Sequence, residues 1–217
     1  MTFRGKATTN VCRMKSPQEV VDFSSTLVKA VEKATGHPLD TEPETLPILD
    51  YYCRLYRESR KGKPEGEVAA EGDGVGKLLA PMAGAYFGEV ARKKFECDWH
   101  APLQQYGLWR IQFKHCFLFF NPVAIALEVL SQQETVAWSS SYVTHREDEE
   151  DICSALDAWG PISRNDYYTF SIRWEILDLV SSRLTTTELL AKGVRGDGKV
   201  KVYSSRDYER YIKSLEE

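Results

Sequence analysis

Gly84-Ala-Tyr-Phe-Gly-Glu-Val90 stands at the centre of the stretch from Gly74 to Leu130, which decides the fold of this chain. Apolar residues recur at helical spacing between Val75 and Phe95, and this period predicts one long helix. Small residues form a second stripe on that helix, at Ala80, Gly84, Gly88 and Ala91. A glycine inside a helix costs roughly 1 kcal/mol relative to alanine. Two glycines in one stripe therefore predict that another element packs closely against it.

A β-hairpin is predicted next, over residues 108–120. Apolar and polar side chains alternate from Leu108 to Phe113, which is the period of a strand. Lys114-His115 can turn the chain, and Cys116 to Phe120 returns as an apolar strand. Asn121-Pro122 then opens another helix, because asparagine caps helices and proline fits the first helical position.

Helices are also predicted on both sides of this stretch. Ser16-Pro17-Gln18-Glu19 has the pattern of a helix start, a second helix is expected over residues 46–61, and three more follow Thr144. Residues 61–74 are rich in Gly and Glu and have almost nothing to bury, which predicts a mobile internal loop. The predicted fold class is α+β. It is a helix-rich single domain over residues 1–217, with a central antiparallel hairpin or small sheet packed by helices.

Composition and charge argue against several classes of partner. The chain has 217 residues and a net charge of -4, whereas nucleic-acid binding needs a basic field to displace counterions. The longest apolar run, Cys116 to Phe120, is far too short to span a bilayer. We therefore expect no nucleic acid and no membrane as partners. Scattered cysteines and a polar first segment without a signal peptide predict reduced thiols and a cytoplasmic location.

The usual signatures of catalysis and metal binding are missing from the sequence. No Gly-x-Ser-x-Gly elbow occurs, and Gly72 to Lys77 lacks the further glycine and the hydroxyl of a phosphate loop. Cys97, His100, His115 and Cys116 are of metal-ligand type. The last two are adjacent, however, and so face opposite ways in an extended strand. We expect no catalytic residue, no metal and no cofactor. Whether the chain is an enzyme stays open, and the missing signatures favour a non-enzymatic protein.

Five consecutive acids, from Glu147 to Asp151, form the most charged segment of the chain. Acids in a first helical turn are stabilised by the helix dipole, and the same acids can steer a basic partner. Tyr167, Tyr168 and Tyr208 are expected to be exposed aromatic anchors of such a contact. The candidate binding residues are Glu147, Asp148, Glu149, Asp151, Tyr167 and Tyr168. This interpretation predicts a protein-binding chain that acts by occluding a surface of its partner.

The alternative is a pocket between the helix of residues 75–95 and the hairpin of residues 108–120. Its lining would be Tyr86, Glu89, Trp99, Trp109 and His115. Burial of Glu89 in an apolar helix would raise the pKa of its carboxyl group, although an ion pair with Arg92 or Lys93 is a purely structural explanation. On this interpretation the chain is a small-ligand-binding protein or an enzyme.

The segment from Leu79 to Leu130 carries Gly-Ala-Tyr-x-Gly-Glu-Val, Trp99 and Asn121-Pro122. This pattern resembles small uncharacterised bacterial proteins, in which such a helix is followed by a tryptophan, two strands and an Asn-Pro helix. Some of those proteins are immunity-like. The resemblance implies the architecture, a bacterial source and an immunity-like or regulatory role with a protein partner of unknown identity. It implies no catalytic residue. This chain departs at Glu96-Cys97-Asp98, where those proteins often have a glycine turn.

Overall fold

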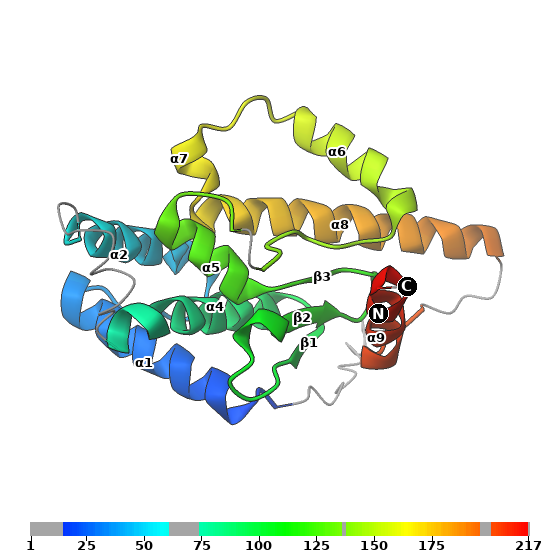
Figure 1. Ribbon diagram of the computed structural model, residues 1–217. Coiled ribbons are helices and arrows are strands. Elements are labelled where there is room, and N and C mark those ends of the chain that lie inside the picture. Colours follow the sequence, from blue (N-terminus) through cyan, green and yellow to red (C-terminus); the bar gives the residue numbers. More distant parts are fainter. Residues whose placement is uncertain (1–14, 61–73, 136–137, 196–200, 217) are drawn as a thin grey trace, which may run out of the picture.

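The computed structural model describes residues 15–60, 74–135, 138–195 and 201–216 (Figure 1). The fold is α+β and rich in helix, with a small antiparallel sheet, as the sequence predicts. The loop predicted over residues 61–74 lies outside the described residues, except for Gly74, where helix α4 begins.

Helix α4 (Gly74–Lys94) is the central element, and it matches the helix predicted over residues 75–95. From Leu79 to Arg92 every residue is buried except Glu89. Helix α1 (Gln18–Thr35) packs against α4, and so does helix α5 (Pro122–Ser131). A Cβ atom on Gly84 would lie 2.7 Å from the Cα of Val123. The close approach predicted from the small-residue stripe is therefore confirmed, and α5 is the element that makes it.

The sheet has three short strands in the order β1 (Cys97–His100), β2 (Arg110–Phe113) and β3 (Phe119–Phe120). Both pairings are antiparallel, so the predicted hairpin is confirmed as β2 and β3. Its strands are shorter than predicted, because Leu108 belongs to a 3-10 turn and the return strand begins only at Phe119. Strand β1 was not predicted, because four residues are too few to show a period. Its Trp99 pairs with Ile111 and lays its ring against Gly88, where an added Cβ would lie 2.2 Å from the indole.

Asn121 fixes the turn from the sheet into α5, as its sequence position predicts. The side-chain oxygen accepts hydrogen bonds from the backbone N–H groups of Val123 (2.8 Å) and Ala124 (3.1 Å). The side-chain nitrogen donates to the carbonyls of Tyr106 and Gly107. One residue thus satisfies two free amides of the helix N-terminus and ties the helix to the loop before β2.

The long helix α8 (Phe170–Arg195) runs across the molecule (Figure 1). Helices α6 (Glu149–Asp157) and α7 (Arg164–Tyr167) lie on one side of it, and α5 and α2 (Leu46–Glu58) lie on the other. A carboxylate of α2 caps its start: Asp50 accepts hydrogen bonds from the backbone N–H groups of Phe170 (2.6 Å) and Ser171 (3.0 Å).

Helix α9 (Ser205–Glu216) covers the outer side of the strands through a second, smaller apolar cluster. Phe117, Phe119, Tyr203 and Tyr208 form this cluster. The Tyr208 hydroxyl donates to the carbonyl of Phe113 at 2.5 Å. The expectation that Tyr208 is exposed is wrong, because the residue is 1% exposed and holds α9 on the sheet.

Candidate functional site

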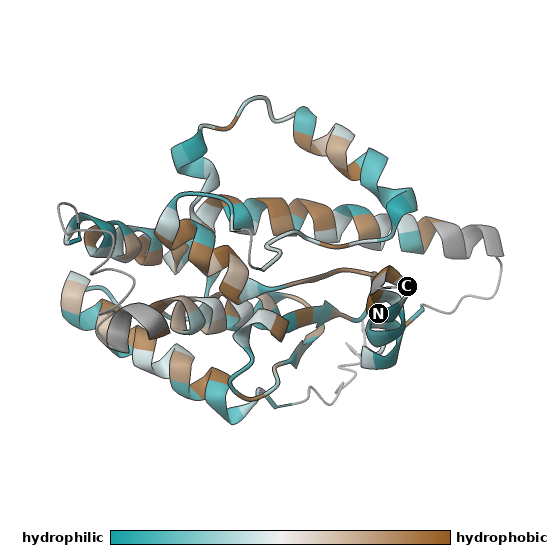
Figure 2. Cartoon of the chain, viewed as in Figure 1, coloured by the Kyte–Doolittle hydropathy of each residue, from teal (hydrophilic) through white to brown (hydrophobic). Residues whose placement is uncertain are grey.

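A groove of about 740 Å³ runs between α6 and α8. One wall comes from the short turn η3 (Arg146–Asp148), α6 and the loop after it, and the other comes from α8. The residues that line it are Glu147, Asp148, Asp151, Trp159, Glu175, Asp178, Leu179, Ser182, Arg183, Thr186, Thr187 and Leu190. In Figure 2 the N-terminal end of α6 is coloured as hydrophilic, where the acidic run enters this groove.

The groove is strongly acidic. Among its described lining residues are five carboxylates, three from the acidic run and two from α8, and one guanidinium, that of Arg183. Glu175 and Asp178 are three residues apart, which places both on the same face of α8. A concave surface lined by one sign of charge focuses its electric field and attracts ions of the opposite sign. This arrangement favours a cationic ligand.

The pKa of Asp148 reflects its burial first and the neighbouring charges second. Burial raises the pKa of its carboxyl group, and the neighbouring charges of Glu147, Glu188 and Asp151 raise it further, while His145 opposes them. The ionised form of Asp148 is therefore held at a cost in this structure. A cation placed in the groove would relieve that cost.

Exposed apolar side chains lie among the acids. Trp159 is 42% exposed and Leu190 is 69% exposed, and both line the groove. Isolated exposed apolar residues are ordinary, but here they sit inside a concave, charged surface. Aromatic and leucine side chains in such a place can bury the apolar face of a partner while the carboxylates meet its charges.

The groove leads into a smaller pocket of about 140 Å³, which we call the end pocket. Glu147, Asp148 and Thr187 belong to both cavities. The remaining lining of the end pocket is Cys116, Phe117, His145, Leu184, Glu188, Lys201 and Tyr203. Residues from the hairpin, α8 and the segment before α9 thus meet at one end of the acidic groove.

Hydrogen bonds fix the walls of the end pocket. The Tyr203 hydroxyl donates to Oε1 of Glu188 at 2.6 Å, and burial together with this carboxylate raises the pKa of the phenol. Burial also raises the pKa of the Cys116 thiol to about 12. A thiol that stays protonated is a poor nucleophile, so Cys116 gives the pocket no reactive group.

The acidic residues predicted as a binding surface are brought together only in part. Glu147, Asp148 and Asp151 line the groove, whereas Glu149 is exposed on α6 and does not. Sequence reasoning missed the second wall on α8 and the exposed Trp159. The spacing of Glu175 and Asp178 is the signal that a search for paired acids on one helix face would have found.

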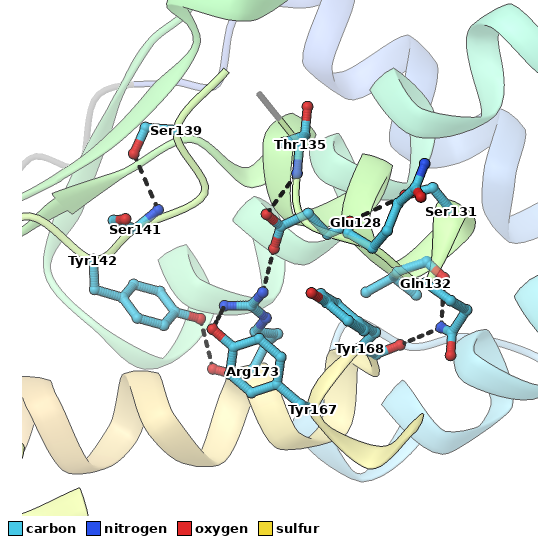
Figure 3. Close-up of polar contacts among 12 residues, drawn as sticks. Glu128, Ser131, Gln132, Thr135, Ser139, Ser141, Tyr142, Tyr167, Tyr168 and Arg173 are labelled. Atoms are coloured by element: carbon cyan, nitrogen blue, oxygen red, sulfur yellow. Dashed lines mark hydrogen bonds and ion pairs between the residues drawn. The ribbon is translucent and has the colours of Figure 1, made fainter. Parts of the chain in front are cut away.

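The two tyrosines singled out with the acidic run lie elsewhere, around a buried ion pair (Figure 3). Arg173 of α8 bonds to Glu128 of α5, and their side chains are 4% and 2% exposed. Arg173 also donates to the Tyr167 hydroxyl at 2.9 Å. The expectation that Tyr168 is exposed is wrong, because it is 9% exposed and its carbonyl accepts from Gln132. Tyr167 remains 36% exposed.

The alternative pocket residues are mostly packed in the core. Trp109 is fully buried and donates to the carbonyl of Pro102 at 3.0 Å. Tyr86 is fully buried too, and its hydroxyl meets Thr41 and Thr45. His115 lies apart and pairs with Glu96 at 3.0 Å. Trp109 also packs edge-on against the ring of Trp99, with ring centroids 5.7 Å apart.

Glu89 and Trp99 meet where α4 crosses the sheet. The indole N–H of Trp99 donates to Oε1 of Glu89 at 2.6 Å, and the Ser16 hydroxyl donates to the same oxygen at 2.8 Å. Arg92 lies 3.3 Å from that oxygen. The carboxylate is thus held by its neighbours, and the Trp99 ring fills the space beside Gly88.

Within the described part of the chain, no three His, Cys, Asp or Glu side chains gather as a metal site would require. His100 lies 3.8 Å from Glu209, far from the pairing of His115 with Glu96. Among the helices that the structure describes, none combines the length and the apolar character needed to cross a bilayer.

Comparisons of the chain with protein-family models, with curated proteins and with solved structures found no match.

Proposed function

We propose that this chain is a non-enzymatic binding protein that takes a basic, amphipathic segment of a protein partner into the groove between α6 and α8. The observation that carries the proposal is the joining of five carboxylates with Trp159 and Leu190 in one concave surface. Charge on both walls would steer the partner, and the apolar side chains would anchor it. Occupying that segment would occlude it from its other contacts.

The proposal includes the immunity-like or regulatory role, and the bacterial and cytoplasmic setting, that the sequence suggests. Its support there is the resemblance over residues 79–130 and the composition of the chain. An inhibitor of this kind needs complementary charge and shape, and no catalytic group. The described lining of the groove, with its five carboxylates, agrees with the requirement for charge.

The proposal can be tested with a synthetic helical peptide that carries lysine on one face and leucine on the other. Trp159 is 42% exposed in the groove, so its fluorescence should change when the peptide binds. The Glu147→Lys/Asp151→Lys variant puts positive charge on one wall of the groove. We expect it to weaken peptide binding by about tenfold or more, with the loss mainly in the dissociation rate.

The matched control is Glu149→Lys/Glu150→Lys. It makes the same change in net charge within the same acidic run, but neither residue lines the groove. This control should lose little affinity and should mainly slow association, because its charges act only at a distance. Equal losses of affinity in both variants would show that the peptide responds to overall charge, and the groove would be dismissed as the site.

A further inference from the structure

We infer that the end pocket binds the primary ammonium group of a lysine side chain, and that Lys201 of the chain itself holds this place until a ligand displaces it. The inference deepens the proposed function, because the basic segment in the groove would supply that lysine.

The position of Lys201 is the observation that points to an ammonium. Its Nζ lies 4.3 Å from the centroid of the Tyr203 ring, and the residue lines the pocket. A cation over the face of an aromatic ring is attracted by the ring's quadrupole. Among the described residues Lys201 makes no ion pair within 4.0 Å. Its ammonium therefore sits on the ring, and no carboxylate of the described residues holds it there.

The charges around the pocket also favour a cation. Glu147, Asp148 and Glu188 all line it, and among the lining residues that the structure describes Lys201 is the only lysine or arginine. Glu188 already accepts the Tyr203 hydroxyl through Oε1. An ammonium has three donors, so a ligand ammonium that lies nearer to the carboxylates than the Lys201 Nζ does can contact the ring and a carboxylate oxygen together. The pocket presents both kinds of partner together.

The walls are held in place before any ligand arrives. The Phe117 ring is stacked between His145, at 4.0 Å and 15°, and Tyr208, at 4.8 Å and 18°. Tyr203 meets the same ring edge-on at 5.4 Å. Such packing leaves the Tyr203 ring few alternative positions. A pocket of about 140 Å³ bounded in this way has room for the end of an extended side chain.

The inference makes a prediction that a plain acidic surface does not. Removing Lys201 takes away a positive charge and a competitor, so the Lys201→Met variant should bind a small ammonium several-fold more tightly. Glu188→Gln removes one carboxylate charge and should weaken binding by a similar factor. The probe is n-butylammonium, which has the form of a lysine side chain, and n-butanol is its uncharged counterpart.

Binding is measured from NMR shifts of the Tyr203 and His145 ring protons during titration. Lys213→Met on α9 is the matched control, because it removes the same charge outside the pocket. An unchanged or weaker affinity in Lys201→Met overturns the inference. Equal binding of n-butanol also overturns it, and so does tighter binding of n-butylguanidinium, because the pocket would then not be built for lysine.

The two proposals fail in different ways. Leu190 lines the groove but not the end pocket, so Leu190→Ala should weaken the amphipathic peptide and leave n-butylammonium unaffected. If the peptide binds in the groove but n-butylammonium does not bind, the ammonium subsite is wrong and the proposed function stands. If n-butylammonium binds and the peptide does not, the subsite stands and the partner is not a basic helical segment.

Discussion

Gly84 and Gly88 show how two residues of one stripe can serve different contacts. A Cβ on Gly84 would meet backbone atoms, with Val123 Cα at 2.7 Å and the Pro122 carbonyl oxygen at 2.8 Å. A Cβ on Gly88 would instead meet the ring of Trp99. A clash with backbone atoms cannot be removed by a mutation, whereas a clash with a side chain can be removed by replacing that side chain. The two positions therefore differ in whether a second substitution can relieve the clash.

We predict that Gly84→Ala and Gly88→Ala each lower the free energy of unfolding by about 1–3 kcal/mol, because overpacking outweighs the better helix propensity of alanine. In a Trp99→Leu background the loss at Gly88 should shrink, and the loss at Gly84 should persist. Urea unfolding of the single and double variants measures both. A stabilised Gly84→Ala protein would contradict the close approach of α4 and α5.

At the scale of elements, the pair of Arg173 and Glu128 joins α8 to α5 inside the protein (Figure 3). Glu128 also accepts the backbone N–H of Thr135 at 3.1 Å, and the Tyr142 hydroxyl donates to the Arg173 carbonyl at 2.6 Å. The two residues of the pair thus also hold Thr135, after α5, and Tyr142 in place. The geometry of the pair explains why Tyr167 and Tyr168 are placed as they are.

Removing one member of a buried ion pair leaves the other charge without compensation. We predict that Arg173→Ala lowers the free energy of unfolding by about 3–5 kcal/mol. The double variant Arg173→Met/Glu128→Leu removes both charges at similar volume and should recover most of that loss. Chemical denaturation of the two proteins is the measurement. A double variant no more stable than Arg173→Ala would show that the pair is not the main cause.

At the scale of the whole molecule, the negative charge of the acidic groove lowers the stability of the fold while it favours binding of a cationic partner. Asp148 has a raised pKa, so the folded protein holds its proton more firmly than the unfolded chain does. The contribution of Asp148 to stability therefore falls as the pH rises from the usual range of an aspartate through its raised pKa. At neutral pH the ionised group is a net cost. Glu147, Asp151, Glu188 and His145 are the titratable groups that face it.

We predict that Asp148→Asn raises the Tm at pH 7 and weakens binding of the basic peptide. Affinity of the unchanged protein should fall as the pH is lowered toward the raised pKa of Asp148, since the groove loses negative charge. Thermal unfolding and peptide titration across the acidic range check both effects. A lower Tm in Asp148→Asn would show that its charge stabilises the fold.

The sequence predicted the elements whose signal is local. The period of residues 75–95 predicted α4, and Asn121-Pro122 predicted the capped start of α5, because spacing and capping depend on near neighbours. Strand β1 escaped prediction since Cys97–His100 becomes a strand only by pairing with β2. Tyr168 was misjudged because its burial comes from residues distant in sequence, such as Gln132.

For the same reason, the sequence predicted one wall of the candidate site and not the other. The acids of residues 147–151 are consecutive and visible in the sequence, and three of them line the groove. Glu175 and Asp178 join them only because α8 folds back beneath α6 (Figure 1). Tyr203 and Lys201 reach the end pocket after a further return of the chain. Such meetings depend on tertiary packing, which no local pattern contains.

The second aromatic cluster has a consequence for how the molecule opens. Helix α9 is held by Phe117, Phe119, Tyr203 and Tyr208, apart from the large core around α4. A unit with its own small set of contacts can detach at a lower free energy than global unfolding needs. Backbone amides of α9 therefore exchange their hydrogens with solvent through a smaller fluctuation than those of α4.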